Sequence, residues 1–275
     1  MSKKVNYKLI FSDLDQTLIV KNHIPTFNLE AIKKAKEKGV KFIISTGRNY
    51  DYMCHLLKEL ETENLENEYT ICNSGSTIYE NKNKNLIYFK GIDNETLNLI
   101  FEYGKKISEI FIMFDTFNGT FLYNEEKLDK ENMKYFKYKV IKNIDDIKNT
   151  EIIRIVFSKN DLKFLKNIEK EIKKDKNFEN KVSYYISANR FLEFNAFGVS
   201  KGEALKWLSN YLKVDIKETI AIGDNYNDES MIKEAGLGCC VKSANDDIKK
   251  ISKYICEKDY FEGSVKEIID KFILN

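Results

Sequence analysis

Apolar and polar positions follow two different rhythms along the chain. In the outer thirds, short runs of consecutive apolar residues alternate with stretches of helical period, in which apolar side chains recur every three or four positions. The apolar runs predict buried strands at 7–13, 40–46, 69–74, 219–224 and 236–242. The helical stretches predict helices at 29–39, 49–60, 201–212 and 228–235. This alternation is typical of a parallel sheet that is covered by helices on both faces.

The middle third has a different pattern, rich in aromatic residues that alternate with polar ones. It predicts strands at 86–91, 110–116, 119–124, 151–158, 182–188 and 191–196. Asn118-Gly119 indicates a hairpin between two of these strands, and helices are predicted at 93–106 and 160–174. We therefore predict an α/β fold in which a mixed α+β domain on an antiparallel sheet, residues 81–190, interrupts a parallel sheet.

Composition narrows the classes of function. The 275 residues carry a net charge of only +2, and the lysines are interleaved with acidic residues, as at 169–176. A protein that binds nucleic acid would concentrate basic charge on one face, so we predict no nucleic-acid partner. The five cysteines form no pattern typical of a zinc site, and no apolar run reaches the roughly 20 residues that cross a membrane. We expect a cytoplasmic protein without a membrane partner.

Polar residues gather where the predicted parallel strands end. Asp13 and Asp15 follow the first strand, Thr46-Gly47-Arg48 follow the second, and Lys201 begins a helix. Asp224, Asn227 and Asp228 follow a strand near the C-terminus. Each group alone has an ordinary explanation as a turn or a helix cap. Together they must face one another, because the carboxyl ends of parallel strands converge on one crevice.

A cluster of carboxylates in such a crevice repels itself unless a cation is bound. Oxygen ligands without histidine or cysteine favour Mg²⁺. The candidate metal ligands are Asp13, Asp15 and Asp224, with Asn227 and Asp228 positioning the ion or Lys201.

The same residues meet the needs of phosphoryl transfer, which requires a nucleophile, positive charge on the phosphate oxygens and a proton donor for the leaving oxygen. Asp13 is the candidate nucleophile, and Asp15 is the candidate acid and base. Thr46, Gly47, Arg48 and Lys201 are the candidate substrate-binding residues, and we count Thr46 and Lys201 as catalytic too. For Arg48, contact with the phosphate and attachment of the inserted domain stay open.

The motifs DLDQTL (13–18), STGR (45–48), VSKGEAL (199–205) and GDNYNDESMI (223–232), in this order, resemble those of the haloacid dehalogenase-like hydrolases. CNSGSTIY (72–79) resembles a turn of the narrower Cof-type (class IIB) sugar-phosphatase-like subfamily. The resemblance implies a Rossmann-like doubly wound core, residues 1–80 and 191–275, with an inserted cap domain. It also implies Mg²⁺, a phosphorylated Asp13 and a small phosphorylated metabolite as substrate.

Other functions remain open at this point. A phosphomutase or phosphotransferase would share the nucleophile, and a metabolite-binding regulator would keep the fold without catalysis. The intact acidic residues count against the regulator. The sequence leaves the identity of the substrate and the oligomeric state open. Gln16 stands where most members of the family have glycine, so we expect strain there if the backbone needs a positive φ.

Overall fold

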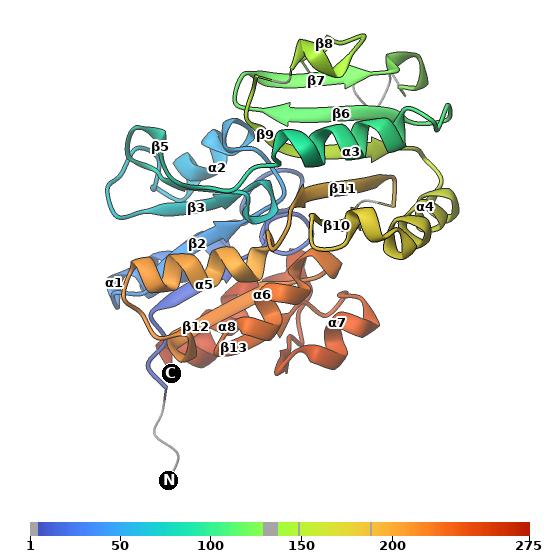
Figure 1. The fold of residues 1–275 in the computed structure, drawn as a ribbon. Helices are drawn as coiled ribbons and strands as arrows, with labels where there is room; N and C mark the ends of the chain where they lie inside the picture. The colour runs from blue at the N-terminus through green and yellow to red at the C-terminus, as the bar shows by residue number, and fades with distance from the viewer. Residues whose placement is uncertain (1–4, 129–136, 148, 188) are drawn as a thin grey trace. The chain divides into compact units, whose positions relative to one another are not determined.

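The chain divides into two compact units (Figure 1). The computed structural model describes residues 5–128, 137–147, 149–187 and 189–275. The first unit, Met1–Phe89 with Ser200–Asn275, is called the core unit below, and the second, Lys90–Val199, is called the inserted unit.

The core unit is built on an eight-stranded sheet with the order β14-β13-β12-β1-β2-β3-β4-β5. The strands from β14 to β3 in this order run parallel to one another. The last two pairs, β3 with β4 and β4 with β5, are antiparallel. The strands are β1 (Leu9–Ser12), β2 (Lys41–Ser45), β3 (Tyr69–Cys72), β4 (Thr77–Glu80), β5 (Asn85–Phe89), β12 (Thr219–Gly223), β13 (Leu237–Cys240) and β14 (Tyr254–Ile255). The predicted Rossmann-like parallel sheet is confirmed.

Helices cover both faces of this sheet because successive strand residues point in opposite directions. In β1, Leu9 and Phe11 pack with α5 and α6, while Ile10 packs with α1 and α8 on the other face. The helices are α1 (Thr26–Glu37), α2 (Cys54–Glu59), α5 (Lys201–Tyr211), α6 (Glu229–Glu234), α7 (Asp246–Ile251) and α8 (Ser264–Ile269). All four residues of β1 are buried.

The inserted unit is a six-stranded sheet with the order β10-β11-β9-β6-β7-β8, antiparallel except for the β7–β8 pair. Its strands are β6 (Phe111–Thr116), β7 (Gly119–Tyr123), β8 (Tyr138–Val140), β9 (Ile152–Ser158), β10 (Val182–Ser187) and β11 (Phe191–Ala196). The apolar sides of α3 (Asn94–Gly104) and α4 (Leu162–Lys174) pack against one face of the sheet. The Asn118-Gly119 hairpin joins β6 to β7, and Gly119 has φ +115°.

The boundaries between the units differ from the prediction by nine residues on each side. The prediction placed them after residues 80 and 190, and the compact units divide after Phe89 and Val199. β5 belongs to the core unit because it pairs with β4 and because Tyr88 packs on Trp207, with ring centroids 4.9 Å apart. β11 belongs to the inserted unit because it pairs with β9 and β10.

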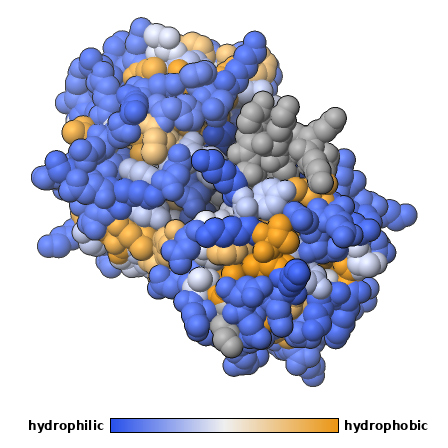
Figure 2. All heavy atoms as spheres, turned by 90° about the horizontal axis from the view of Figure 1, so that it is seen from above, coloured by the Kyte–Doolittle hydropathy of each residue, from blue (hydrophilic) through white to orange (hydrophobic). Residues whose placement is uncertain are grey.

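The face in Figure 2 is mostly hydrophilic, in keeping with the 32% of charged residues. Across the described ranges, no helix is both long and apolar enough to cross a membrane.

Candidate active site

Asp13 and Asp224 stand at the carboxyl ends of two adjacent strands. The backbone N–H of Asp13 donates to the Ile222 carbonyl at 2.9 Å, which extends the parallel pairing of β1 with β12 by one residue. Asp224 follows directly after β12 and accepts a hydrogen bond from the Thr17 hydroxyl at 2.9 Å. The strand register thus brings two carboxylates together that are far apart in sequence.

A third carboxylate, Asp228, completes a buried cluster that we call the acidic cluster. Single carboxylate oxygens of Asp13, Asp224 and Asp228 lie within 4.8 Å of one another. Asp228 sits in a short 3₁₀ turn after β12, and its Oδ2 accepts the N–H groups of Asp224 and Asn225 at 3.0 and 3.1 Å. These bonds fix the Asp228 side chain against the backbone beside Asp224.

Lys201 reaches this cluster from the first position of α5. Ser200 caps the helix by accepting the N–H of Glu203 at 3.1 Å. The Lys201 ammonium, fully buried, donates to Asp13 Oδ1 and, at 2.6 Å, to Asp228 Oδ1. In the part of the chain that the structure describes, no other lysine or arginine forms an ion pair with these three carboxylates.

The cluster therefore holds three carboxylates against one ammonium. Burial raises the pKa of Asp13 well above its ordinary value, Asp228 raises it further, and Lys201 opposes both. Burial is also the main reason that the pKa of Asp224 rises to about 7. For Lys201, burial lowers the pKa, but the two partner carboxylates outweigh it and raise the pKa above its usual value. A divalent cation fits this donor set, because its charge would offset the excess negative charge and oxygen ligands suit a hard cation.

The Asp15 carboxylate lies outside the acidic cluster, and the role of Asp15 as a metal ligand stays a prediction. Its carboxylate is 54% exposed and accepts two hydrogen bonds from Arg48, from Nε at 2.9 Å and from Nη2 at 2.5 Å. Arg48 Nη1 also donates to Asn22 at 2.7 Å. The third carboxylate of the cluster is that of Asp228, which the sequence predicted to position the ion or Lys201.

Gln16 adopts the left-handed conformation, with φ +61°. The chain turns there so that the Leu14 carbonyl can accept the N–H groups of Leu18 and Ile19 at 3.0 and 3.1 Å. A residue other than glycine in this conformation costs about 1–2 kcal/mol. The expected positive φ is therefore present at this position. Glutamine adopts it at that cost, and its side chain is exposed.

The other predicted site residues lie in two loops of the core unit. Thr46 is buried, donates its N–H to the Ile71 carbonyl at 3.0 Å and accepts the N–H of Arg48 on its hydroxyl at 3.2 Å. Gly47 stands between them. Asn227 is half-buried in the turn that carries Asp228, and no hydrogen bond joins its side chain to the acidic cluster within the described ranges.

Thr17, Asn22 and Asn225 have contacts here that the sequence reasoning did not assign. The contact of Thr17 could have been suspected from the sequence, since Thr17 belongs to the same motif as Asp13. The contact of Asn22 could not have been suspected, because its position beside Arg48 depends on a loop with left-handed residues at Lys21 and Asn22.

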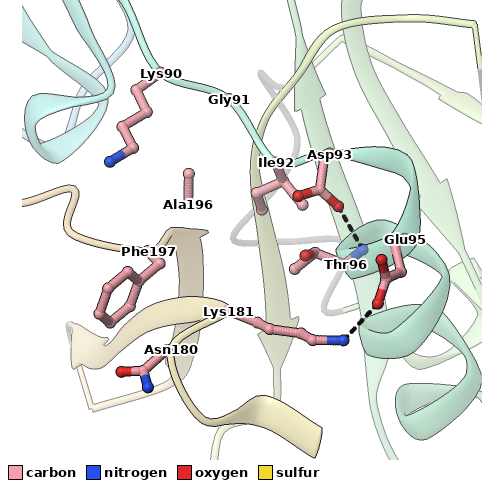
Figure 3. Close-up of a pocket in the computed structure, with 10 residues that line it drawn as sticks. All are labelled: Lys90, Gly91, Ile92, Asp93, Glu95, Thr96, Asn180, Lys181, Ala196 and Phe197. Carbon is pink, nitrogen blue, oxygen red and sulfur yellow. Dashed lines mark hydrogen bonds and ion pairs between the residues drawn. The ribbon is translucent and has the colours of Figure 1, made fainter.

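A separate hollow of about 310 Å³ lies within the inserted unit (Figure 3). Two bonds join residues of its lining: Lys181 pairs with Glu95 at 2.5 Å, and Asp93 caps α3 by accepting the Thr96 N–H at 2.7 Å. None of the predicted site residues lines it.

The chain is similar to known proteins along almost its whole length. A family model for haloacid dehalogenase-like hydrolases matches residues 10–269. A phosphoglycolate phosphatase of Methanobrevibacter smithii is 30% identical, with 98% of this chain and 100% of that protein covered. A 5-amino-6-(5-phospho-D-ribitylamino)uracil phosphatase of Bacillus subtilis is 29% identical, with 96% and 95% covered.

Solved structures share the fold. A haloacid dehalogenase-like hydrolase from Bacteroides thetaiotaomicron superposes with a TM-score of 0.80 at 25% identity, covering 96% of this chain and 99% of that one. A sugar phosphatase of subclass IIB in the same superfamily has a TM-score of 0.81 at 20% identity, covering 96% and 98%.

Proposed function

This chain belongs to the haloacid dehalogenase-like hydrolases, of the Cof type that its motifs predicted, and on that premise we propose that it is a Mg²⁺-dependent phosphatase of small phosphorylated metabolites. One observation carries the proposal: Lys201 bridges Asp13 and Asp228 inside a buried acidic cluster. A cluster of this kind is costly to bury, and phosphoryl transfer uses each of its groups.

Asp13 is the nucleophile of the proposed reaction. Its carboxylate oxygen attacks phosphorus, the bond from phosphorus to the ester oxygen breaks, and the leaving oxygen takes a proton. Water then attacks the phosphorus of the aspartyl phosphate, loses a proton and releases inorganic phosphate, which restores the carboxylate. Lys201 donates to Asp13 and so holds the attacking carboxylate in one orientation, and its charge favours a phosphate beside it.

Asp13 and Asp224 are the better candidates to hold Mg²⁺. Asp228 already uses Oδ1 for Lys201 and Oδ2 for two backbone N–H groups, so its role is to position Lys201. When bound, the ion supplies positive charge to the phosphate and to the acidic cluster. Thr46 and Gly47 are proposed to contact the phosphate from the end of β2.

The direct test is phosphate release from an aryl phosphate with Mg²⁺ and with a chelator. We expect release only with the divalent cation. A panel of metabolite esters follows, including phosphoglycolate and 5-amino-6-(5-phospho-D-ribitylamino)uracil, the compounds named for the two relatives. Isomerised sugar phosphate without free phosphate would instead identify a mutase, and no turnover of any ester would contradict the proposal.

Asp15 is the proposed acid and base, and its replacement gives a graded prediction. Asp15→Asn removes the proton donor, so alkyl esters, whose leaving oxygens are poor, should lose about 100- to 10,000-fold in kcat. Aryl esters with good leaving groups need less protonation and should lose less in the first step. The measurement is kcat for matched aryl and alkyl phosphates. Equal losses for both would argue against the acid role.

The proposed location is the cytoplasm. All five cysteines are free thiols, which is the usual state in a reducing compartment.

A further inference from the structure

The turn between β3 and β4 has a backbone conformation that needs an explanation. Asn73, Ser74 and Gly75 have φ values of +50°, +57° and +103° in succession. Two of the three carry side chains, and each such residue costs roughly 1–3 kcal/mol in this region. All three are buried. A buried turn with this strain persists only where contacts around it hold it in place.

One set of these contacts is made with the loop of Thr46. The N–H of Asn73 donates to the Arg48 carbonyl at 3.0 Å, and the N–H of Ser74 donates to the Thr46 carbonyl at 2.9 Å. Left-handed residues make this possible, because they turn successive N–H groups toward the same side. The Ser74 hydroxyl also lies 3.2 Å from where a Cβ on Gly47 would stand. The turn therefore fixes the backbone on both sides of Gly47.

The other contact is made with the start of α5. A Cβ on Gly75 would overlap the Ser200 carbonyl oxygen and stand 2.7 Å from the Ser200 carbonyl carbon and 3.3 Å from the Ala204 side chain. Ser200 is the residue immediately before Lys201, and its carbonyl accepts the Ala204 N–H at 3.0 Å. Gly75 thus lies directly against the backbone that places the buried lysine.

We propose that the turn Asn73–Gly75 is a positioning element that holds Thr46 and Lys201 in register with each other. Those two residues are 155 positions apart in sequence: Thr46 follows β2, and Lys201 begins α5. Both are phosphate-binding groups in the proposed reaction, so this inference rests on the proposed function. The contacts described above join the turn to the Thr46 loop and to the first turn of α5, so its effect is proposed to pass through these two segments.

Gly75→Ala is the main test. The added methyl group must push the Ser200 carbonyl and shift Lys201, and a displacement of about 1 Å can cost about 100-fold in rate. We expect kcat to fall by that order and inhibition by inorganic phosphate to weaken. The Mg²⁺-induced rise in Tm should stay as in the wild type, because Asp13 and Asp224 are held by β1 and β12.

The matched control is Gly39→Ala. Gly39 has φ +82°, yet apart from its chain neighbours no residue has an atom within 4 Å of the position of its Cβ, so this variant adds backbone strain without a collision. It should lose stability and keep the wild-type kcat and phosphate inhibition. A Gly75→Ala variant that folds and retains kcat and phosphate inhibition within about two-fold of wild type would overturn the inference.

Ser74→Gly decides the question if Gly75→Ala does not fold. Glycine adopts the same φ without strain, so this variant should fold, while a looser turn should lower kcat several-fold. Wild-type kcat in this variant would then overturn the positioning role. Different results would contradict the two proposals. If the wild-type protein releases no phosphate, the proposed function is wrong. If the wild type is active and the turn variants are fully active too, only the positioning role of the turn is wrong.

Discussion

Asp13→Asn should reduce phosphate release by about 10,000-fold or more, because the amide cannot form the aspartyl phosphate. The positions of the neighbouring acidic residues support this large expected loss. Asp13 sits at the end of a fully buried strand with its carboxylate on Lys201, and Asp15, the next acid in the chain, is bonded to Arg48 outside the acidic cluster. The other two carboxylates of the acidic cluster have proposed roles of their own, Asp224 with the metal and Asp228 with Lys201. The measurement is kcat with Mg²⁺ and an aryl phosphate.

The same variant should remain folded. The pKa of the Asp13 carboxyl is raised in the folded protein, so its charged form disfavours folding as pH rises above the ordinary carboxyl value. A neutral amide removes that effect, so Tm at pH 8 without metal should equal or exceed that of the wild type. Asp161→Asn is the matched control, since Asp161 caps α4 in the inserted unit and asparagine caps equally well. Full activity of Asp13→Asn would refute the assignment of the nucleophile.

The positions of Asp13 and Asp224 could be predicted from the sequence for a physical reason. Each follows a run of apolar residues that can only be a buried strand, and parallel strands of one sheet end on the same edge. The same reasoning places Lys201 at the start of its helix. None of these inferences requires knowledge of a side-chain rotamer.

The exposed position of the Asp15 carboxylate could not be predicted in that way. After Asp13 the chain enters a tight turn with Gln16 in the left-handed region, which leaves the Asp15 carboxylate exposed to Arg48. Asp228 turns inward because its Oδ2 satisfies the N–H groups of Asp224 and Asn225. The hydrogen bonds of both side chains lie within loops, and the spacing of residues does not encode them, although the sequence did predict Asp228 as a partner of the ion or of Lys201.

The unit boundaries were missed for a related reason. β5 and β11 both have the aromatic, alternating pattern of the inserted unit, and this pattern indicates a strand without indicating its sheet. β5 joins the core unit through β4 and through the contact of Tyr88 with Trp207 on α5. Such a contact between residues more than a hundred positions apart is a property of the folded chain.

Lys201→Met should damage both catalysis and folding. Removing the ammonium leaves Asp13 and Asp228 buried without their partner, and breaking a buried ion pair in this way costs about 3–5 kcal/mol of unfolding free energy. We also expect a loss of about 100- to 1,000-fold in kcat, the usual effect of removing one group that stabilises the transition state. Denaturant unfolding and kcat with an aryl phosphate measure the two losses.

The matched control for this variant lies on the same helix. Lys206 is 39% exposed and pairs with Glu203 at 2.5 Å and Glu234 at 3.5 Å, so Lys206→Met should cost less than about 1 kcal/mol and leave kcat unchanged. An equal loss of stability in the two variants would show that the buried ion pairs of Lys201 add nothing beyond the effect of replacing a lysine in this helix.

The stability loss of Lys201→Met should also depend on pH and on Asp13. Lys201 is the group that opposes the raised pKa of Asp13, so without it that pKa rises further, and the loss should be greatest near pH 8 and shrink as pH falls and the carboxyl takes up a proton. Adding Asp13→Asn removes one of the two unpaired charges. Asp13→Asn should therefore stabilise the Lys201→Met variant by more than it stabilises the wild type. An equal effect of Asp13→Asn in both backgrounds would mean that the two side chains are not coupled.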